Sequence, residues 1–341
     1  MPSTRQTELR LMHHYISEMA LSPRSAFKGK SFMTDASRFG DTIALLSSHD
    51  NMLYAVFAAS ATHLLSTKSF GRESDVASNS KAESKPLNGS NANSSASLPT
   101  DLTSERLTSL RDDYLHLAYR EQRDRLAKVT PANINSICFA SMLISLTEIA
   151  LLAARELDPY QPPLKWLQMG HGMGVVFDTA NEHMHVLDPK WAAGLMDTAN
   201  PHLEDEAVAS EALIRTGDIG RNLLTVSQDT SEDIHDAATF RFYEEAIKYV
   251  GTLLVALDRE TAESVIAVRV VGFPAWVEPE FISFVGQQRP RALVILAHLF
   301  AIAQRLTSTW WVKDTPEREI SAIWDVLTPR WRALMPLTHP G

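Results

Sequence analysis

Several side chains of this sequence belong to types that can bind a metal ion. His171, His183 and His185 lie close in sequence to Asp178 and Glu182, and zinc accepts both imidazole and carboxylate ligands. No two of the three histidines stand four residues apart, the spacing that places two ligands on one face of a helix. The spacing therefore favours a solvated polar loop over a metal site, and we expect neither a metal ion nor a cofactor.

Two other features suggest catalysis or phosphate binding. The run Gly170-His171-Gly172-Met173-Gly174 is rich in glycine, but a dinucleotide-binding loop needs a strand before it, and here a helical segment headed by Trp166 precedes it. Helix packing or a helix break is the better interpretation. The only cysteine, Cys138, has the apolar neighbours Ile137 and Phe139, which indicate burial rather than the electropositive setting of a nucleophile. Neither a Gly-x-Ser-x-Gly elbow nor a His-Glu-x-x-His stretch occurs.

Two isolated histidines are better candidates for a binding site. His63 and His298 each lie in an apolar helical segment, where a histidine is usually a core residue with one satisfied hydrogen bond. If the helices enclose a pocket, these rings could be its few polar groups among apolar walls. The candidate ligand-pocket residues are therefore these two histidines with neighbouring aromatic residues: His63, Phe57, Trp166, His298, Trp310 and Trp311.

A buried helix must position these residues. From Ala292 to Ala303 every residue except His298 is apolar, and a helix that is apolar on all sides is a buried helix. Pro290 suits the first helical position, where its missing N–H costs nothing. The run is too short for a bilayer span, which needs roughly 20 apolar residues. We expect no other apolar run to reach that length, and hence no membrane span.

The remaining segments also show helical spacing, so we predict an all-α fold. It is an irregular multi-helix bundle around a buried central helix near residues 290–305, in one domain covering residues 1–341. Residues 71–100 hold many Ser and Asn and no aromatic residue, which predicts a disordered insert. The β-branched run Val265 to Val271 could also form a strand.

Composition excludes several classes of protein. Of the 341 residues, 45% are hydrophobic, which is enough for a large core. The formal net charge of −9 argues against DNA binding by this chain alone, because DNA binding relies on clustered Lys and Arg. A single cysteine and a polar first segment favour an intracellular protein, in the nucleus or alternatively the cytoplasm.

Several motifs, taken in order, resemble one known family. They are Leu11-Met12-His13-His14-Tyr15, the Ala-rich stretch from Asn51 to Leu64, Tyr114-Leu115-His116-Leu117-Ala118, Trp166-Leu167-Gln168-Met169-Gly170, Gly272-Phe273-Pro274-Ala275, Glu278-Pro279-Glu280-Phe281-Ile282, the run from Arg289 to His298, and Trp310-Trp311-Val312. Together they look like the regulatory domain of fungal zinc-cluster transcription factors, in pattern nearest to the sterol-uptake-control members. The C-terminal motifs are the more specific ones.

This resemblance implies a nuclear regulator of transcription whose helical domain senses a small apolar metabolite, with sterol as one candidate. In that family an N-terminal zinc cluster, built from six cysteines, binds DNA. This sequence has one cysteine and cannot form the cluster, so the resemblance implies that DNA contact needs a partner transcription-factor chain.

Two other interpretations stay open at this stage. The helical domain could serve as an enzyme of fungal small-molecule biosynthesis, such as a cyclase or isomerase, because catalysis by positioning needs few diagnostic residues. The chain could also be a truncated product that pairs with a full-length relative.

Overall fold

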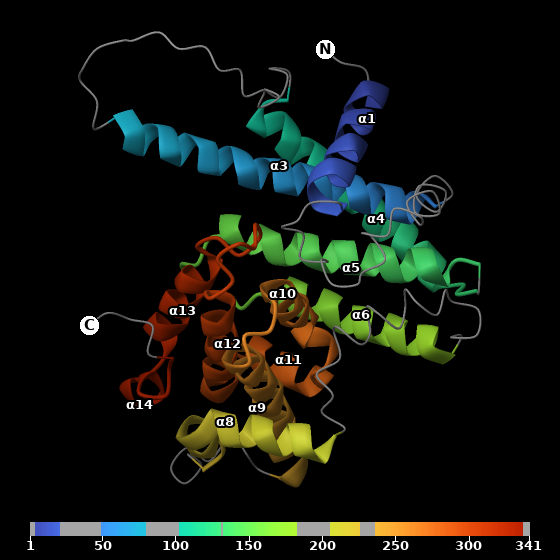
Figure 1. Ribbon diagram of the computed structural model, residues 1–341. Helices are drawn as coiled ribbons and strands as arrows, with labels where there is room; N and C mark the ends of the chain where they lie inside the picture. The colour runs from blue at the N-terminus through green and yellow to red at the C-terminus, as the bar shows by residue number, and fades with distance from the viewer. Residues whose placement is uncertain are drawn as a thin grey trace.

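The computed structural model of the protein describes residues 4–20, 49–79, 102–130, 132–182, 205–225 and 236–336. Within these ranges every regular element is a helix (Figure 1), and the all-α prediction is confirmed. The N-terminal helices are α1 (Thr4–His14), a π-helical segment (Tyr15–Ala20), α3 (Asp50–Asn79), α4 (Ser104–Leu126), α5 (Ile134–Leu151) and α6 (Leu164–Glu182). The C-terminal helices are α8 (Glu206–Thr225), α9 (Ala237–Asp258), α10 (Glu263–Gly272), α11 (Pro279–Gly286), α12 (Pro290–Ala303), α13 (Thr315–Val326) and α14 (Pro329–Arg332), with short 3-10 turns at Leu152–Ala154 and Phe273–Ala275.

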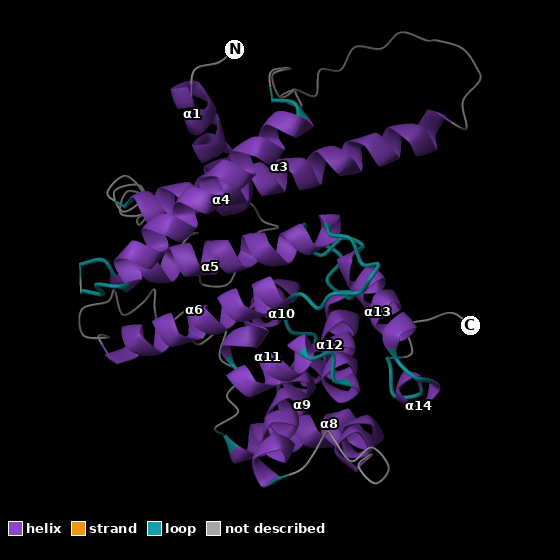
Figure 2. Cartoon of the chain, turned by 180° about the vertical axis from the view of Figure 1, so that it is seen from behind, coloured by secondary structure: helices purple, strands orange, loops and turns teal. Residues whose placement is uncertain are grey.

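Two hydrophobic cores divide these helices into two layers. The first core joins α1, α3 and α4 to one part of α5 and α6, and the second joins the rest of α5 and α6 to helices α8 to α14. In Figure 1 helices α5 and α6 accordingly lie between α3 and α4 on one side and α8, α9 and α12 on the other, and Figure 2 shows the same order from behind. Trp310 packs against both cores.

The predicted central helix is observed as α12. Its apolar residues are buried, with Leu296 and Leu299 fully enclosed, while His298 is half-buried. Arg291 is also fully buried, and its guanidinium lies over the rings of Tyr243 and Trp331, at 5.4 and 5.2 Å from their centroids. The aromatic faces offer the buried cation an attractive electrostatic contact.

The expectation that no apolar run reaches membrane-spanning length is wrong for α5 and the turn after it. Ile134–Ala154 is a helical stretch of 21 residues, long and apolar enough to cross a bilayer. Its most apolar window is 78% buried inside the protein, as in the core helix of a folded domain. It is the only such stretch among the described residues.

Two other expectations concerned local structure. The β-branched run is helical, because Ile266, Ala267 and Val270 fall on one face of α10 and are buried together in the second core. The predicted insert begins inside α3, whose backbone stays helical through Asn79, and residues 80–101 lie outside the described part of the chain.

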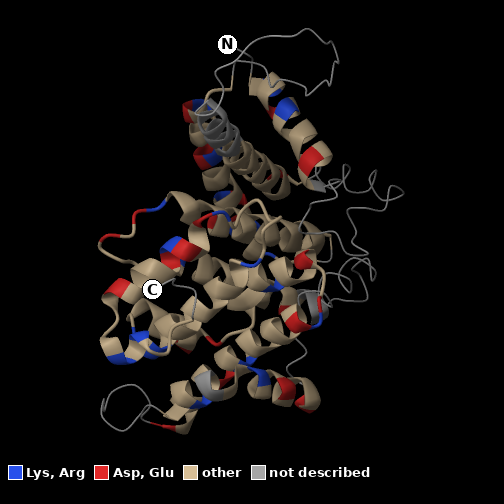
Figure 3. Cartoon of the chain, turned by 60° about the vertical axis from the view of Figure 1, so that its left-hand side comes forward, with Lys and Arg blue, Asp and Glu red and all other residues tan. Residues whose placement is uncertain are grey.

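Basic and acidic residues are interspersed along the helices (Figure 3). One buried ion pair joins distant segments: Arg155 Nη2 lies 2.6 Å from Glu319 Oε1, and the Glu319 side chain is 1% exposed. Arg318 donates hydrogen bonds to the carbonyl oxygens of Ala153 and Arg155. These contacts fasten α13 to the connection between α5 and α6.

Candidate ligand cavity

A cavity of about 500 Å³ lies between α8, α9 and α12. This volume falls within the range of known small-molecule sites. Its walls are mainly aliphatic, and the lining residues of this type are Leu223, Ile247, Val250, Leu254, Leu257, Ile295, Ala301 and Ile302. The polar lining side chains are Arg215, Thr216, His298, Gln304 and Arg305. Among the described residues the lining contains no carboxylate and no cysteine.

Glycines determine how α8 approaches α9 beside this cavity. A Cβ atom placed on Gly251 of α9 would lie 2.3 Å from the carbonyl oxygen of Ala212, so the two backbones touch there. Helix α8 changes direction at Gly217, whose φ of +56° and ψ of −132° together form a conformation that is essentially restricted to glycine. Residues on both sides of this kink, Thr216 and Leu223 among them, line the cavity.

His298 is the polar group of the α12 wall. Its Nε2 lies 2.9 Å from the carbonyl oxygen of Leu334. Burial lowers the pKa of the His298 ring, and the hydrogen bond to Leu334 opposes that effect. The ring is therefore neutral at physiological pH.

Two arginines lie at one end of the cavity. Arg291 near the start of α12 stacks on Tyr243 near the start of α9, and the Ser308 N–H, after the end of α12, donates to Glu263, just after the end of α9. The two helices therefore run in the same direction. At the C-terminal end of α9, Arg215 forms an ion pair with Asp258. Arg305 is exposed, and its side chain makes no hydrogen bond or ion pair with the described residues.

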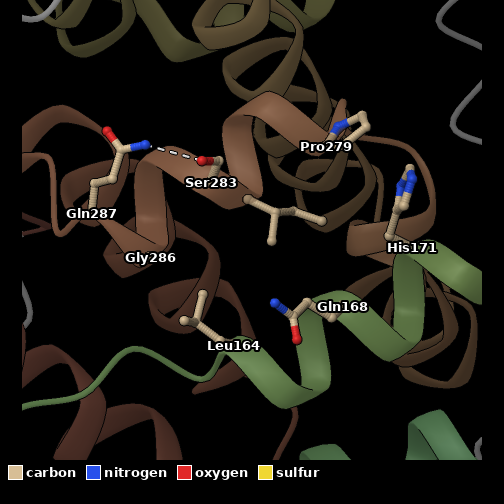
Figure 4. Close-up of a pocket in the computed structure, with 8 residues that line it drawn as sticks. Leu164, Gln168, His171, Pro279, Ser283, Gly286 and Gln287 are labelled. Atoms are coloured by element: carbon tan, nitrogen blue, oxygen red, sulfur yellow. Dashed lines mark hydrogen bonds between the residues drawn. The ribbon is translucent and has the colours of Figure 1, made fainter.

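A second cavity of about 510 Å³ lies between α6 and α11 (Figure 4). Figure 4 shows Leu164 and Gln168 on α6 opposite Ser283 on α11 and Gln287 directly after it. The Gln287 amide donates a hydrogen bond of 3.0 Å to the Ser283 hydroxyl. His171 also lines this cavity, but its Nδ1 is buried and has no partner among the described residues.

Two of the six predicted site residues meet at the junction of the layers, away from either cavity. The His63 ring packs edge-on against Trp310, with 4.9 Å between centroids, and its Nδ1 lies 2.8 Å from Nε2 of His14. Burial, followed by the neighbouring His14, lowers the pKa of His63 to about 4. Burial also lowers the pKa of His14. One ring therefore donates to the other, and the pair stays uncharged at neutral pH.

The other predicted aromatic residues are core residues in the structure. Phe57 is buried in the first core against Tyr114, with 5.0 Å between ring centroids. Trp166 and Trp311 are buried in the second core, and Trp166 lies 6.3 Å from Phe300 by ring centroids. Among the six candidates, His298 alone lines one of the two cavities described above.

The aliphatic walls from α8 and α9 were not among the predicted site residues. Ile247, Val250 and Leu254 repeat at helical spacing, which is also the pattern of any helix face packed in a core. No signal in the sequence distinguishes a wall with empty space in front of it from one covered by other side chains.

The glycine-rich run lies within helix α6 and not in a loop. A Cβ on Gly170 would lie 2.8 Å from Pro274, and one on Gly174 would lie 2.7 Å from the Ala275 carbonyl oxygen. The run therefore allows α6 to pack closely on the turn Phe273–Ala275, as the helix-packing interpretation predicts.

The metal and thiol candidates can be placed only in part. Within the described residues no cluster of three or more His, Cys, Asp or Glu could hold a metal ion, and His183 and His185 lie outside that part of the chain. Cys138 is fully buried, and burial raises its pKa to about 12, so the thiol is unsuited to be a nucleophile.

Comparison with known proteins relates the chain to one class of fungal regulators. It is similar to the Zn(2)-C6 fungal-type transcription factor afumD of Aspergillus fumigatus, with 26% identity over 293 residues, 85% of this chain and 66% of the relative. It is also similar to a Zn(2)-C6 fungal-type transcription factor of Gibberella zeae, with 24% identity over 232 residues, 61% of this chain and 42% of the relative. No family model matches the chain.

The chain is thus distantly homologous to fungal Zn(2)-C6 transcription factors over most of its own length. It spans slightly less than two thirds of the first relative and less than half of the second. The 341 residues contain a single cysteine, so they do not include a six-cysteine zinc cluster.

Proposed function

We propose that this chain is the regulatory part of a fungal transcription regulator, and that a small apolar metabolite binds between α8, α9 and α12. The observation that supports the proposal is the cavity of about 500 Å³ with aliphatic walls and few polar side chains, in a chain related to transcription factors. We propose the nucleus as its location and a partner transcription-factor chain as its contact to DNA.

The mechanism would be a shift between two conformations of the domain. A ligand shifts such an equilibrium only by the difference between its affinities for the two states. Helix α8 has a point at which it can bend, because it changes direction at Gly217. A ligand in the cavity would hold α8 at a defined distance from α12.

The experiment is to fill the cavity and read transcription in the native host. Leu254→Trp places a large ring at the cavity wall, which should favour one of the two conformations. The transcript profile should therefore shift towards the profile that this conformation produces. The control is Leu126→Trp on α4, where the leucine is 42% exposed and far from the cavity in sequence and layer. If deletion of the gene and Leu254→Trp both leave every transcript unchanged, the proposal is wrong.

Binding is tested separately on the protein purified from its host. Native mass spectrometry followed by organic extraction should identify a small apolar molecule bound to the wild-type chain and absent from Leu254→Trp. An identical mass and extract for both proteins would contradict the assignment of this cavity.

A further inference from the structure

The hydrogen bond from His298 determines which of its ring nitrogens carries the proton. A backbone carbonyl oxygen can only accept, so Nε2, at 2.9 Å from the Leu334 oxygen, must be the donor. In a neutral imidazole the other nitrogen then has no proton. Nδ1 of His298 is therefore a hydrogen-bond acceptor.

This acceptor is available to a ligand. The His298 ring makes no hydrogen bond within the described part of the chain other than the one to Leu334. Its Nδ1 is not among the unpartnered nitrogens that are closed off from solvent, in contrast to Nδ1 of His171. His298 lines the cavity beside Ile295 and Ile302, so the mostly aliphatic wall includes a ring whose second nitrogen is an acceptor without a hydrogen bond among the described residues.

We propose that the cavity selects neutral apolar molecules that carry a hydroxyl group, and that the hydroxyl donates a hydrogen bond to Nδ1 of His298. The inference rests on the proposed function, because it assumes that this cavity binds a ligand. A hydroxyl group satisfies the lone pair of Nδ1 inside apolar walls. An ether, ketone or carboxylate oxygen at the same place would set two lone pairs against each other.

The ring has no low-cost way to reverse this preference. Moving the proton to Nδ1 would leave Nε2 and the Leu334 oxygen as two facing acceptors at 2.9 Å. Protonating the whole ring is opposed by its burial. His298 is thus a specificity-determining residue for a donor group on the ligand.

Molecules that carry a carboxylate are the competing class of ligand for the same cavity. Arg215 and Arg305 line its far end, and the Arg305 side chain is the cation there without a partner among the described residues. An acid bound at that end would use the arginines and leave His298 unused. The test must therefore separate an alcohol from an acid with the same hydrocarbon chain.

The experiment compares three probes with one chain length: 1-dodecanol, dodecyl methyl ether and dodecanoate. Equilibrium dialysis against the wild-type protein should give about tenfold tighter binding of the alcohol than of the ether. His298→Leu should remove that preference while the ether still binds. His298→Gln should keep part of it, because a glutamine amide can donate to Leu334 and accept from the hydroxyl.

His171→Gln is the matched control, because His171 is a half-buried histidine lining the other cavity. It should leave the preference for the alcohol unchanged. Nitrogen-15 NMR of labelled histidine adds a readout on the wild-type protein, in which the Nδ1 resonance of His298 should shift with the alcohol and not with the ether.

The outcomes separate this inference from the proposed function. Equal affinity for the alcohol and the ether, or tightest binding of dodecanoate, would overturn the selection of hydroxyl groups and leave a ligand cavity in place. No binding of any probe would contradict the assignment of this cavity as a ligand site, and with it this inference. A transcript profile altered by Leu254→Trp would still support the regulatory function on its own evidence.

Discussion

The histidines of this chain differ in role because their hydrogen-bond partners differ. His298 donates to a carbonyl oxygen and has no hydrogen bond at its other nitrogen among the described residues, whereas His63 shares a proton with His14 at the junction of the two layers. Both lie among apolar residues, so their immediate sequence surroundings are alike. The partner that decides each role lies 36 residues from His298 and 49 residues from His63.

The buried pair of His63 and His14 should make folding sensitive to acid. His63 has a folded-state pKa of about 4 against an ordinary value of 6.5, so between these pH values the unfolded chain binds a proton that the folded chain does not. The free energy of unfolding therefore falls as pH is lowered through this window, by up to about 1.4 kcal/mol per pH unit.

We expect His63→Gln to remove about 1–2 kcal/mol of the difference in unfolding free energy between neutral pH and about pH 5. Urea unfolding of both proteins at the two pH values measures this difference. His116→Gln, at an exposed position on α4, is the control and should behave as the wild type. An unchanged pH dependence in His63→Gln would show that the pair does not stay neutral in the fold.

The buried ion pair between Arg155 and Glu319 should stabilise the attachment of α13. Glu319→Gln leaves the guanidinium without its counter-charge at a site where Glu319 is 1% and Arg155 19% exposed. We expect a loss of about 2 kcal/mol in unfolding free energy, below the range for fully buried pairs because Arg155 keeps some contact with water.

The comparison is Glu211→Gln, which removes the surface pair with Arg259, where the side chains are 44% and 64% exposed. Exposed pairs contribute about 1 kcal/mol or less, so this change should be small. Thermal and urea unfolding measure both variants. Equal effects of the two changes would mean that burial adds nothing to the Arg155 pair.

At the scale of elements, the cavity depends on how closely α8 packs on α9. Gly251→Ala would put a Cβ atom 2.3 Å from the Ala212 carbonyl oxygen, and a backbone atom cannot move aside as a flexible side chain would. We expect a loss of about 1–3 kcal/mol in unfolding free energy, as for other overpacked sites. We also expect altered binding of the dodecanol probe, because α8 must shift away from α9.

Gly172→Ala provides the matched control for that measurement. Gly172 lies inside α6, and no heavy atom lies within 4 Å of the position that a Cβ atom would take, so the added methyl group meets open space. Alanine at this helical position should raise stability by up to about 1 kcal/mol. If Gly251→Ala and Gly172→Ala have the same stability, the close contact between α8 and α9 does not prevent a larger residue at position 251.

At the scale of the whole molecule, two cores share α5, α6 and Trp310. The Ser66 hydroxyl donates a hydrogen bond of 3.0 Å to the Trp310 carbonyl oxygen, so α3 is tied to the segment that follows α12. Both ligand-sized cavities border the second core. A signal that starts in the α8–α9–α12 cavity would reach the first layer through these shared elements.

The charge of the chain leads to a prediction about DNA. Its net charge is −9, and Figure 3 shows basic residues interspersed with acidic ones on the described helices. We expect no measurable binding of the isolated chain to a duplex at micromolar concentration, because counterion release needs clustered Lys and Arg. Fluorescence anisotropy at low and at physiological salt tests this, with a basic DNA-binding protein as positive control. Binding that weakens steeply with salt would contradict the prediction.

The sequence by itself determined the class of fold and the central helix. The apolar run from Ala292 to Ala303 has no polar face, so it can only be stable when other helices surround it, and α12 is buried as this requires. The ordered motifs also pointed to fungal zinc-cluster regulators, and the distant homology to such proteins agrees. These conclusions rest on local composition and order, which a sequence contains directly.

Tertiary structure decided which candidate residues could meet a ligand. Trp166, Phe57 and Trp311 are as apolar as the cavity walls, and only the packing of distant helices shows that they fill a core while Ile247 and Leu254 border an empty space. The roles of His298 and His63 likewise depend on partners far along the chain. Cavities and hydrogen bonds between helices depend on how the faces of neighbouring helices fit together. The spacing of apolar residues within one helix is the same whether another helix covers that face or a cavity lies in front of it, so the sequence alone does not distinguish the two.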